Sequence, residues 1–268
     1  MNNTDTVNFT GPRRHNGLLE LGPFVDQPGE AQYPLYTDGL MRSGVVAGGV
    51  GYGKSRLVEN IVISALSGGD TEYWYSDPLG GASSPALMEH AGWFTFSGHA
   101  GDLLDAAVAI LDTRRREASA ARRAGFTPSP DCPGLLIVIE ECHRVFGNHD
   151  AAERWATVVN QGAEIGVAVL AVTQTLDLVA FGGNADLRAG LLAGNTVVFR
   201  SVSHTTRQIT NLWVDPRSLP KIPGHAYVQP AAQSGVPAGM FLNRYTGASA
   251  GDWLAAQPRP GRVSRVSA

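Results

Sequence analysis

The residues best suited to chemistry lie in one glycine-rich stretch, which an apolar segment precedes and a helix-like spacing of apolar residues follows. The phosphate-binding pattern GxxxxGK[ST] is matched by Gly48, Gly49, Val50, Gly51, Tyr52, Gly53, Lys54 and Ser55. Such glycines let the backbone wrap an anion and point its N–H groups inward. Lys54 is expected to reach the β- and γ-phosphates, and the Ser55 hydroxyl to bind Mg²⁺. The stretch, with Arg56 after it, predicts a site for ATP with Mg²⁺.

Two carboxylates follow the apolar segment LLIVI at 135–139, which predicts a buried strand ending at Glu140 and Glu141. Ligands of a parallel sheet lie off the carboxyl ends of its strands, so both side chains are expected beside the phosphates. Glu140 would hold the Mg²⁺ shell through water, and Glu141 would polarise the attacking water. The alternative is a solvated pair of glutamates at a strand end.

The apolar segment at 167–174 ends in Thr173 and Gln174. An amide there is suited to sense the γ-phosphate or the attacking water; the alternative is an ordinary hydrogen-bonded strand terminus. A GTPase is disfavoured, because Lys221 lies in LPKIPG and not in an Asn-Lys-x-Asp guanine-binding pattern.

Apolar strands and helices alternate along the chain, which predicts an α/β fold with a mostly parallel sheet covered by helices on both faces. A small β-hairpin is expected before the first core strand, within 17–47. We expect a disordered segment at 1–16, one ATPase domain at 17–256 and a basic disordered tail at 257–268. Strands are predicted at 44–47, 71–77, 93–97, 135–139, 167–174 and 195–202, followed by HAYV and AGMFLNRY, with a long helix at 101–125.

The bulk composition limits the partners. The 268 residues carry a net charge of −3, so any contact with nucleic acid requires a local basic patch or an assembled ring. No apolar run approaches the roughly 20 residues that span a bilayer, and the first residues lack the apolar core of a signal peptide. We therefore expect a cytoplasmic protein, for which a role at a membrane would require a membrane-anchored partner.

With these residues identified, the chain resembles the FtsK/HerA class of P-loop motors, especially the motor domain of TraB-type plasmid-transfer proteins. The resemblance implies a RecA-like core that forms a ring, usually a hexamer, around double-stranded DNA and couples ATP hydrolysis to translocation. It spans about 33–245 and is carried by MRSGVVAGGVGYGKS, Asp77-Pro78 with Gly80-Gly81, RRREASAARRAGF, LLIVIEECHRVF, GVAVLAVTQ, NTVVFRSVSHTTRQI and LPKIPGHAYV.

By this resemblance Lys54 and Ser55 belong to the Walker A motif, Glu140 and Glu141 to an acidic pair, and Gln174 to the sensor strand. Two departures matter. Glu140 stands where the family usually has Asp, and the stretch 162–166 lacks the arginine that serves as a candidate trans-acting finger. The candidates to replace that finger are Arg188 and Arg207.

Further side chains have two interpretations each. The arginines of the long helix either contact DNA phosphates or a neighbouring subunit, or form a solvated face; they are Arg114, Arg115, Arg116, Arg122 and Arg123. The tail arginines either add phosphate affinity or belong to a disordered segment; they are Arg259, Arg262 and Arg265. His143 either couples nucleotide state to DNA or is structural. Aromatic side chains expected in the core are Trp74, Tyr75, Trp93 and Phe94.

The expected function is an ATP-driven translocase of double-stranded DNA, in conjugal transfer, phage DNA handling or segregation. Two alternatives stay open: an ATP-dependent switch or assembly factor, and a secretion or packaging ATPase that moves a different cargo.

Overall fold

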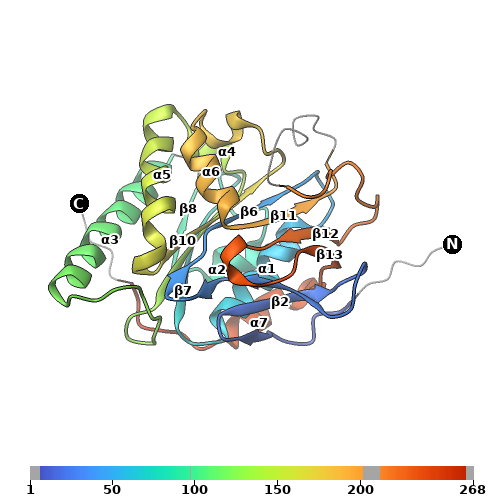
Figure 1. Cartoon of the computed structure of the whole chain (residues 1–268), viewed down its shortest axis with the longest axis horizontal. Helices are drawn as coiled ribbons and strands as arrows, with labels where there is room; N and C mark the ends of the chain where they lie inside the picture. Colours follow the sequence, from blue (N-terminus) through green and yellow to red (C-terminus); the bar gives the residue numbers. More distant parts are fainter. Residues whose placement is uncertain (1–6, 97, 202–211, 264–268) are drawn as a thin grey trace.

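An eight-stranded sheet forms the centre of the computed structural model, which describes residues 7–96, 98–201 and 212–263 (Figure 1). Its strand order is β13-β12-β11-β6-β10-β9-β7-β8. The six strands from β11 to β8 run parallel, and β12 and β13 continue the sheet antiparallel. The strands are β6 (Gly44–Ala47), β7 (Thr71–Ser76), β8 (Trp93–Thr95), β9 (Gly134–Ile139), β10 (Val167–Thr173), β11 (Asn195–Phe199), β12 (His225–Gln229) and β13 (Gly239–Leu242).

Helices cover both faces of this sheet, as expected. The central strands are apolar and buried on both faces, so alternate residues enter two separate cores. One face carries α1 (Lys54–Leu66), α2 (Pro85–His90) and α7 (Ala250–Ala255), and the other carries α3 (Ala100–Ala120), α4 (His143–Phe146), α5 (His149–Gly162) and α6 (Ala185–Ala193).

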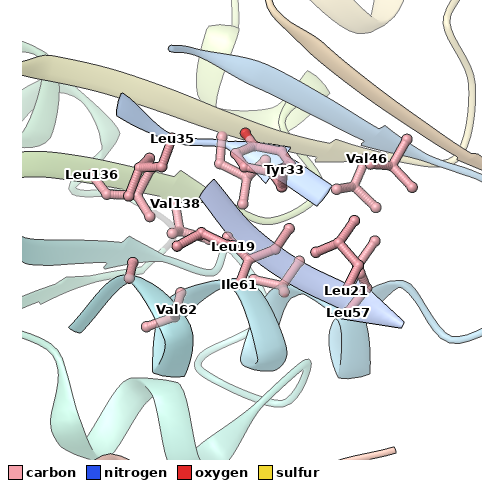
Figure 2. Close-up of a cluster of buried hydrophobic side chains, with 14 of the residues drawn as sticks. Leu19, Leu21, Tyr33, Leu35, Val46, Leu57, Ile61, Val62, Leu136 and Val138 are labelled. Atoms are coloured by element: carbon pink, nitrogen blue, oxygen red, sulfur yellow. The ribbon is translucent and has the colours of Figure 1, made fainter. Parts of the chain in front are cut away.

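The expected hairpin is part of a small antiparallel sheet on the α1 face. Its strands are β1 (Arg14–His15), β2 (Leu18–Pro23) and β3 (Glu30–Pro34), and β4 (Tyr36–Thr37) pairs with β5 (Leu40–Met41). Leu19 and Leu21 of β2 pack on Leu57 and Ile61 of α1, beside Val46 of the central sheet (Figure 2). The small sheet therefore completes one of the two cores.

The disorder expected for 1–16 and 257–268 is not found in their described parts, 7–16 and 257–263. The Arg14 guanidinium donates to both Asp70 carboxylate oxygens, at 2.6 and 2.9 Å, and the Phe9 ring packs edge-on against Trp253 at 5.5 Å. At the other end, the Gly261 N–H donates to the Pro130 carbonyl. Polar composition pointed to disorder, whereas the described parts of both segments make specific contacts with residues far along the chain.

The helix predicted at 101–125 is shorter than expected. It ends at Ala120, because the chain adopts a left-handed conformation at Arg122, whose φ is +48°. The helix α6 and the short helix α7 were not predicted; the Asn184 side chain caps α6 by accepting from the Leu187 N–H at 2.8 Å.

The aromatic residues expected in the core lie there or at its margin. Trp74 and Tyr75 are fully buried, and Trp93 and Phe94 of the edge strand are partly buried against the two cores. Among the described helices, none is both long and apolar enough to cross a bilayer.

Candidate functional site

The glycine-rich stretch forms the turn between β6 and α1, at the carboxyl edge of the sheet. Its path requires glycine: φ is +154° at Gly48, +81° at Gly51 and +110° at Gly53. A Cβ at Gly48 would lie 2.6 Å from the Phe199 Cβ, so the turn also packs tightly against β11. The first N–H groups of a helix have no partner within the helix, so the start of α1 favours an anion at this turn.

Lys54 lies across this turn. Its ammonium donates to the carbonyls of Gly48 and Gly49, at 2.9 and 3.2 Å. Burial lowers the pKa of Lys54, while the nearby carboxylates Glu141 and Glu140 act to raise it. The charged ammonium and both acidic side chains therefore belong to one electrostatic site, although 86 residues separate Lys54 from Glu140 in the sequence.

The sheet order explains how this happens. The strand β10 lies between β6 and β9, with Thr173 in register with Ala47 and Ala171 with Ile139. All three strands end at one edge, so the turn after β6, the acidic pair after β9 and Gln174 after β10 meet there. The structure thus brings Lys54, Glu140, Glu141 and Gln174 together, as the sequence predicted.

Glu140 is buried, with a fractional exposure of 3%, and its Oε1 has no hydrogen-bond partner among the described residues. Burial first, and the nearby Asp77 carboxylate second, raise the pKa of Glu140 to about 8. A buried carboxylate oxygen without a donor is suited to a cation or to water bound to a cation. The side chain is therefore positioned to contribute to a metal site.

Glu141 has an unusual backbone, with φ at +42°, a left-handed conformation that costs a residue with a Cβ on the order of 1 kcal/mol. Its Oε1 accepts a hydrogen bond from the Gln174 Nε2 at 3.0 Å. Its Oε2 lies 3.5 Å from the His143 Nδ1, an ion-pair distance without hydrogen-bond geometry. The Gln174 contact thus orients this carboxylate.

Two further buried carboxylates lie near the acidic pair, and the sequence did not single them out as site residues. Asp77, at the end of β7, is buried and accepts from the N–H groups of Leu79 and Ser83, both at 2.9 Å. The sequence did offer a signal for Asp77, because Asp77-Pro78 ends a predicted strand, as the acidic pair ends another. Asp77 both shapes the loop after β7 and disfavours the charged form of Glu140.

Glu59 is the second such carboxylate, buried in the second turn of α1. It accepts from Arg56 at 2.7 Å, from the Ser84 hydroxyl at 2.7 Å and from the Thr246 hydroxyl at 2.6 Å. One carboxylate thereby joins the helix after the phosphate turn, the start of α2 and the segment after β13. A glutamate among the apolar residues of KSRLVENIVISAL was the only sequence signal.

The arginine candidates separate into different roles. Arg114 is buried and donates to the carbonyls of Pro133, Ile165 and Gly166, so neither expected role applies to it. The other four arginines of that group are exposed. Arg188 lies on α6 with its buried Nε unpaired within the described part of the chain, while Arg207 and Arg265 lie outside the described residues.

A magnesium ion fits the site only together with phosphate oxygens. Among residues 7–96, 98–201 and 212–263, no group of three or more His, Cys, Asp or Glu side chains is arranged to hold a metal. The residues available are Ser55, at the start of α1, and Glu140 with its unpaired Oε1. Mg²⁺ characteristically takes one or two protein ligands and fills its shell with waters and phosphate, so the donor set suits it.

No protein-family model and no curated protein sequence matches this chain. Several solved structures are similar to it. The monomeric form of the pCW3 conjugation coupling protein TcpA, with ATPγS, has a TM-score of 0.68 at 13% identity, covering 90% of this chain and 70% of that one. The cytoplasmic domain of the Type VII secretion ATPase EccC of Thermomonospora curvata has a TM-score of 0.74 at 19% identity, covering 97% of this chain.

The two-ATPase fragment of EssC from Geobacillus thermodenitrificans is also similar, with a TM-score of 0.67 at 11% identity over 90% of this chain. This chain spans 46% of that fragment and 33% of the EccC chain. The fold expected from the sequence, a RecA-like P-loop fold with a mostly parallel, helix-covered sheet and a small N-terminal hairpin, is therefore confirmed.

Proposed function

We propose that this chain binds ATP with Mg²⁺ and hydrolyses its terminal phosphoanhydride bond. The observation that carries this proposal is the contact between Gln174 and Glu141 beside Lys54 and the buried Glu140. A site that only bound phosphate would need the turn and Lys54. It would not need a carboxylate held in a strained conformation and oriented by an amide from the next strand.

Each side chain then has a role. The backbone N–H groups of the turn and the Lys54 ammonium bind the phosphates and stabilise the charge that develops on them. Glu141 accepts a proton from the attacking water, and Gln174 holds Glu141 in the direction of that water. Ser55 and Glu140 would hold Mg²⁺, which supplies positive charge at the β- and γ-phosphate oxygens when bound.

For the use of this energy, we propose translocation of double-stranded DNA by a ring of copies of this chain. Support comes from the order of motifs along the sequence and from the fold shared with a conjugation coupling protein. A secretion or packaging ATPase is the second candidate, because the likeness to the Type VII secretion ATPase EccC extends over 97% of this chain. We also propose that the protein acts in the cytoplasm, with a membrane-anchored partner as a candidate site of assembly for either ring.

The test measures phosphate release by the purified chain with and without duplex DNA at low salt, since binding to DNA phosphates weakens steeply with salt. We expect hydrolysis that duplex DNA stimulates, and its loss in Lys54→Ala and Glu141→Gln. A wild-type rate of phosphate release equal to that of Glu141→Gln would refute the proposed hydrolysis at this site. A rate independent of DNA would favour the second candidate, or an ATP-dependent switch where turnover is very slow.

A further inference from the structure

A half-exposed aromatic side chain lies beside the start of α1, outside the residues assigned so far. Tyr245, in the segment after β13, has a fractional exposure of 51%. Its neighbours in sequence, Arg244 and Thr246, are buried and bind Glu30 and Glu59, so the segment alternates between anchored and outward-facing side chains. The exposure of Tyr245 is thus a consequence of a fixed backbone.

That backbone is held on both sides. The Tyr245 N–H donates to the Val7 carbonyl at 2.8 Å, and the Tyr245 carbonyl accepts from the Phe9 N–H at 3.1 Å. The Glu59 carboxylate adds a third constraint through Thr246 at 2.6 Å. The fixed main chain thus presents the Tyr245 ring at one place, and a planar group that stacks on it needs to order the side chain alone.

The same segment touches Arg56, the residue that follows the phosphate turn. Arg56 Nη1 donates to the Gly247 carbonyl at 3.4 Å and to Glu59 at 2.7 Å. The Tyr245 ring packs over Gly247, where an added Cβ would lie 3.3 Å from the ring's Cε1. Glu59, Arg56 and Gly247 therefore connect the Tyr245 ring to the first turn of α1.

The direction of a bound triphosphate places its nucleoside at this point. Lys54 lies with Glu140 and Glu141, so the γ-phosphate belongs at that end of the turn. A triphosphate that runs from there along the first turn of α1 would bring its α-phosphate toward Ser55 and Arg56 and its ribose and base toward the Tyr245 segment, which Arg56 contacts. We propose that Tyr245, with Arg56 beside it, forms the surface on which the base of the nucleotide stacks; this assignment rests on the proposed ATP binding.

The experiment compares a nucleotide with a ligand that has no base. The dissociation constants of ATP and of inorganic tripolyphosphate are measured with Mg²⁺ by titration calorimetry on the full chain. Removing an aromatic ring that stacks on a base weakens binding by about 5- to 150-fold. We therefore expect Tyr245→Ala to weaken ATP about tenfold or more and to leave tripolyphosphate within about twofold. Tyr245→Phe, which keeps the ring, is expected to bind both ligands like the wild type.

Phe96→Ala is the matched control, because Phe96 is 49% exposed and follows β8, at the opposite edge of the sheet from β13. It is expected to bind both ligands like the wild type. If Tyr245→Ala weakens both ligands equally, or neither, the base assignment is overturned while ATP binding stands. If the wild type binds neither ligand, the proposed function fails, and the base assignment fails with it.

Discussion

Replacing Glu140 by Gln is expected to stabilise the fold while impairing its chemistry. Burial and Asp77 raise the pKa of Glu140 to about 8 in the folded chain, from an ordinary value of 4.5. The folded state therefore binds the Glu140 proton more tightly than the unfolded state does. Below about pH 4.5 the group contributes no penalty. As the pH rises from 4.5 to 8, the unfolded chain loses the proton that the folded chain keeps, so the free energy of unfolding falls.

The size of this penalty follows from the two pKa values. Each pH unit between them corresponds to about 1.4 kcal/mol, so the penalty reaches on the order of 4–5 kcal/mol at and above pH 8 and stays near 1 kcal/mol at pH 5. Glu140→Gln removes the titration and nearly preserves the shape of the side chain. Its stability relative to the wild type should therefore rise by roughly 3 kcal/mol between pH 5 and pH 8.

Urea denaturation without nucleotide or Mg²⁺, at several pH values, measures this difference. The rise of roughly 3 kcal/mol between pH 5 and pH 8 corresponds to a gain in melting temperature, relative to the wild type, of roughly 6–12 °C for a domain of this size. Glu153→Gln, on the exposed surface of α5, is the control and should show no such dependence on pH. A stability difference between Glu140→Gln and the wild type that is equal at pH 5 and pH 8 would refute the reasoning.

Two further predictions concern other contacts. Gln174→Ala leaves Glu141 without its 3.0 Å hydrogen bond. The kcat for ATP hydrolysis should therefore fall by roughly 10- to 100-fold, with KM little changed. An unchanged kcat in steady-state assays would show that Gln174 does not orient Glu141. Arg114→Ala leaves three carbonyls near the core without their donor, so the free energy of unfolding measured in urea should fall by roughly 3 kcal/mol. Arg116→Ala, at an exposed position, should lower it by less than about 0.5 kcal/mol. Equal losses in the two arginine variants would contradict the structural role of Arg114.

Local pattern was enough to predict the central fold. Fully apolar strands such as β9 and β10 are compatible only with burial on both faces, so the helices on both sides followed from the sequence. The proximity of the candidate site residues was predictable because the ends of parallel strands meet at one edge. Lys54, Glu140 and Gln174 each follow a strand of that kind, so their proximity required only the strand order.

Other parts depend on contacts between distant residues. Nothing near Arg114 distinguishes it from Arg115 or Arg116; only the position of the carbonyls before β9 and β10 makes it a buried donor. Likewise, the role of Glu59 arises from Ser84 and Thr246, which lie 25 and 187 residues away along the chain. Such roles come from tertiary packing, which periodicity and propensity do not encode.

The pairing of residues 7–9 with Tyr245 has a practical consequence for anyone who trims the protein. A fragment cut to 17–256 would keep the whole central sheet. It would lose both main-chain partners of Tyr245, the Phe9 ring against Trp253, and the Arg14–Asp70 ion pair. A purification tag or fusion partner is therefore best joined ahead of Val7 through a flexible spacer. An assay on the shorter fragment would measure a molecule whose segment around Tyr245 has lost these contacts.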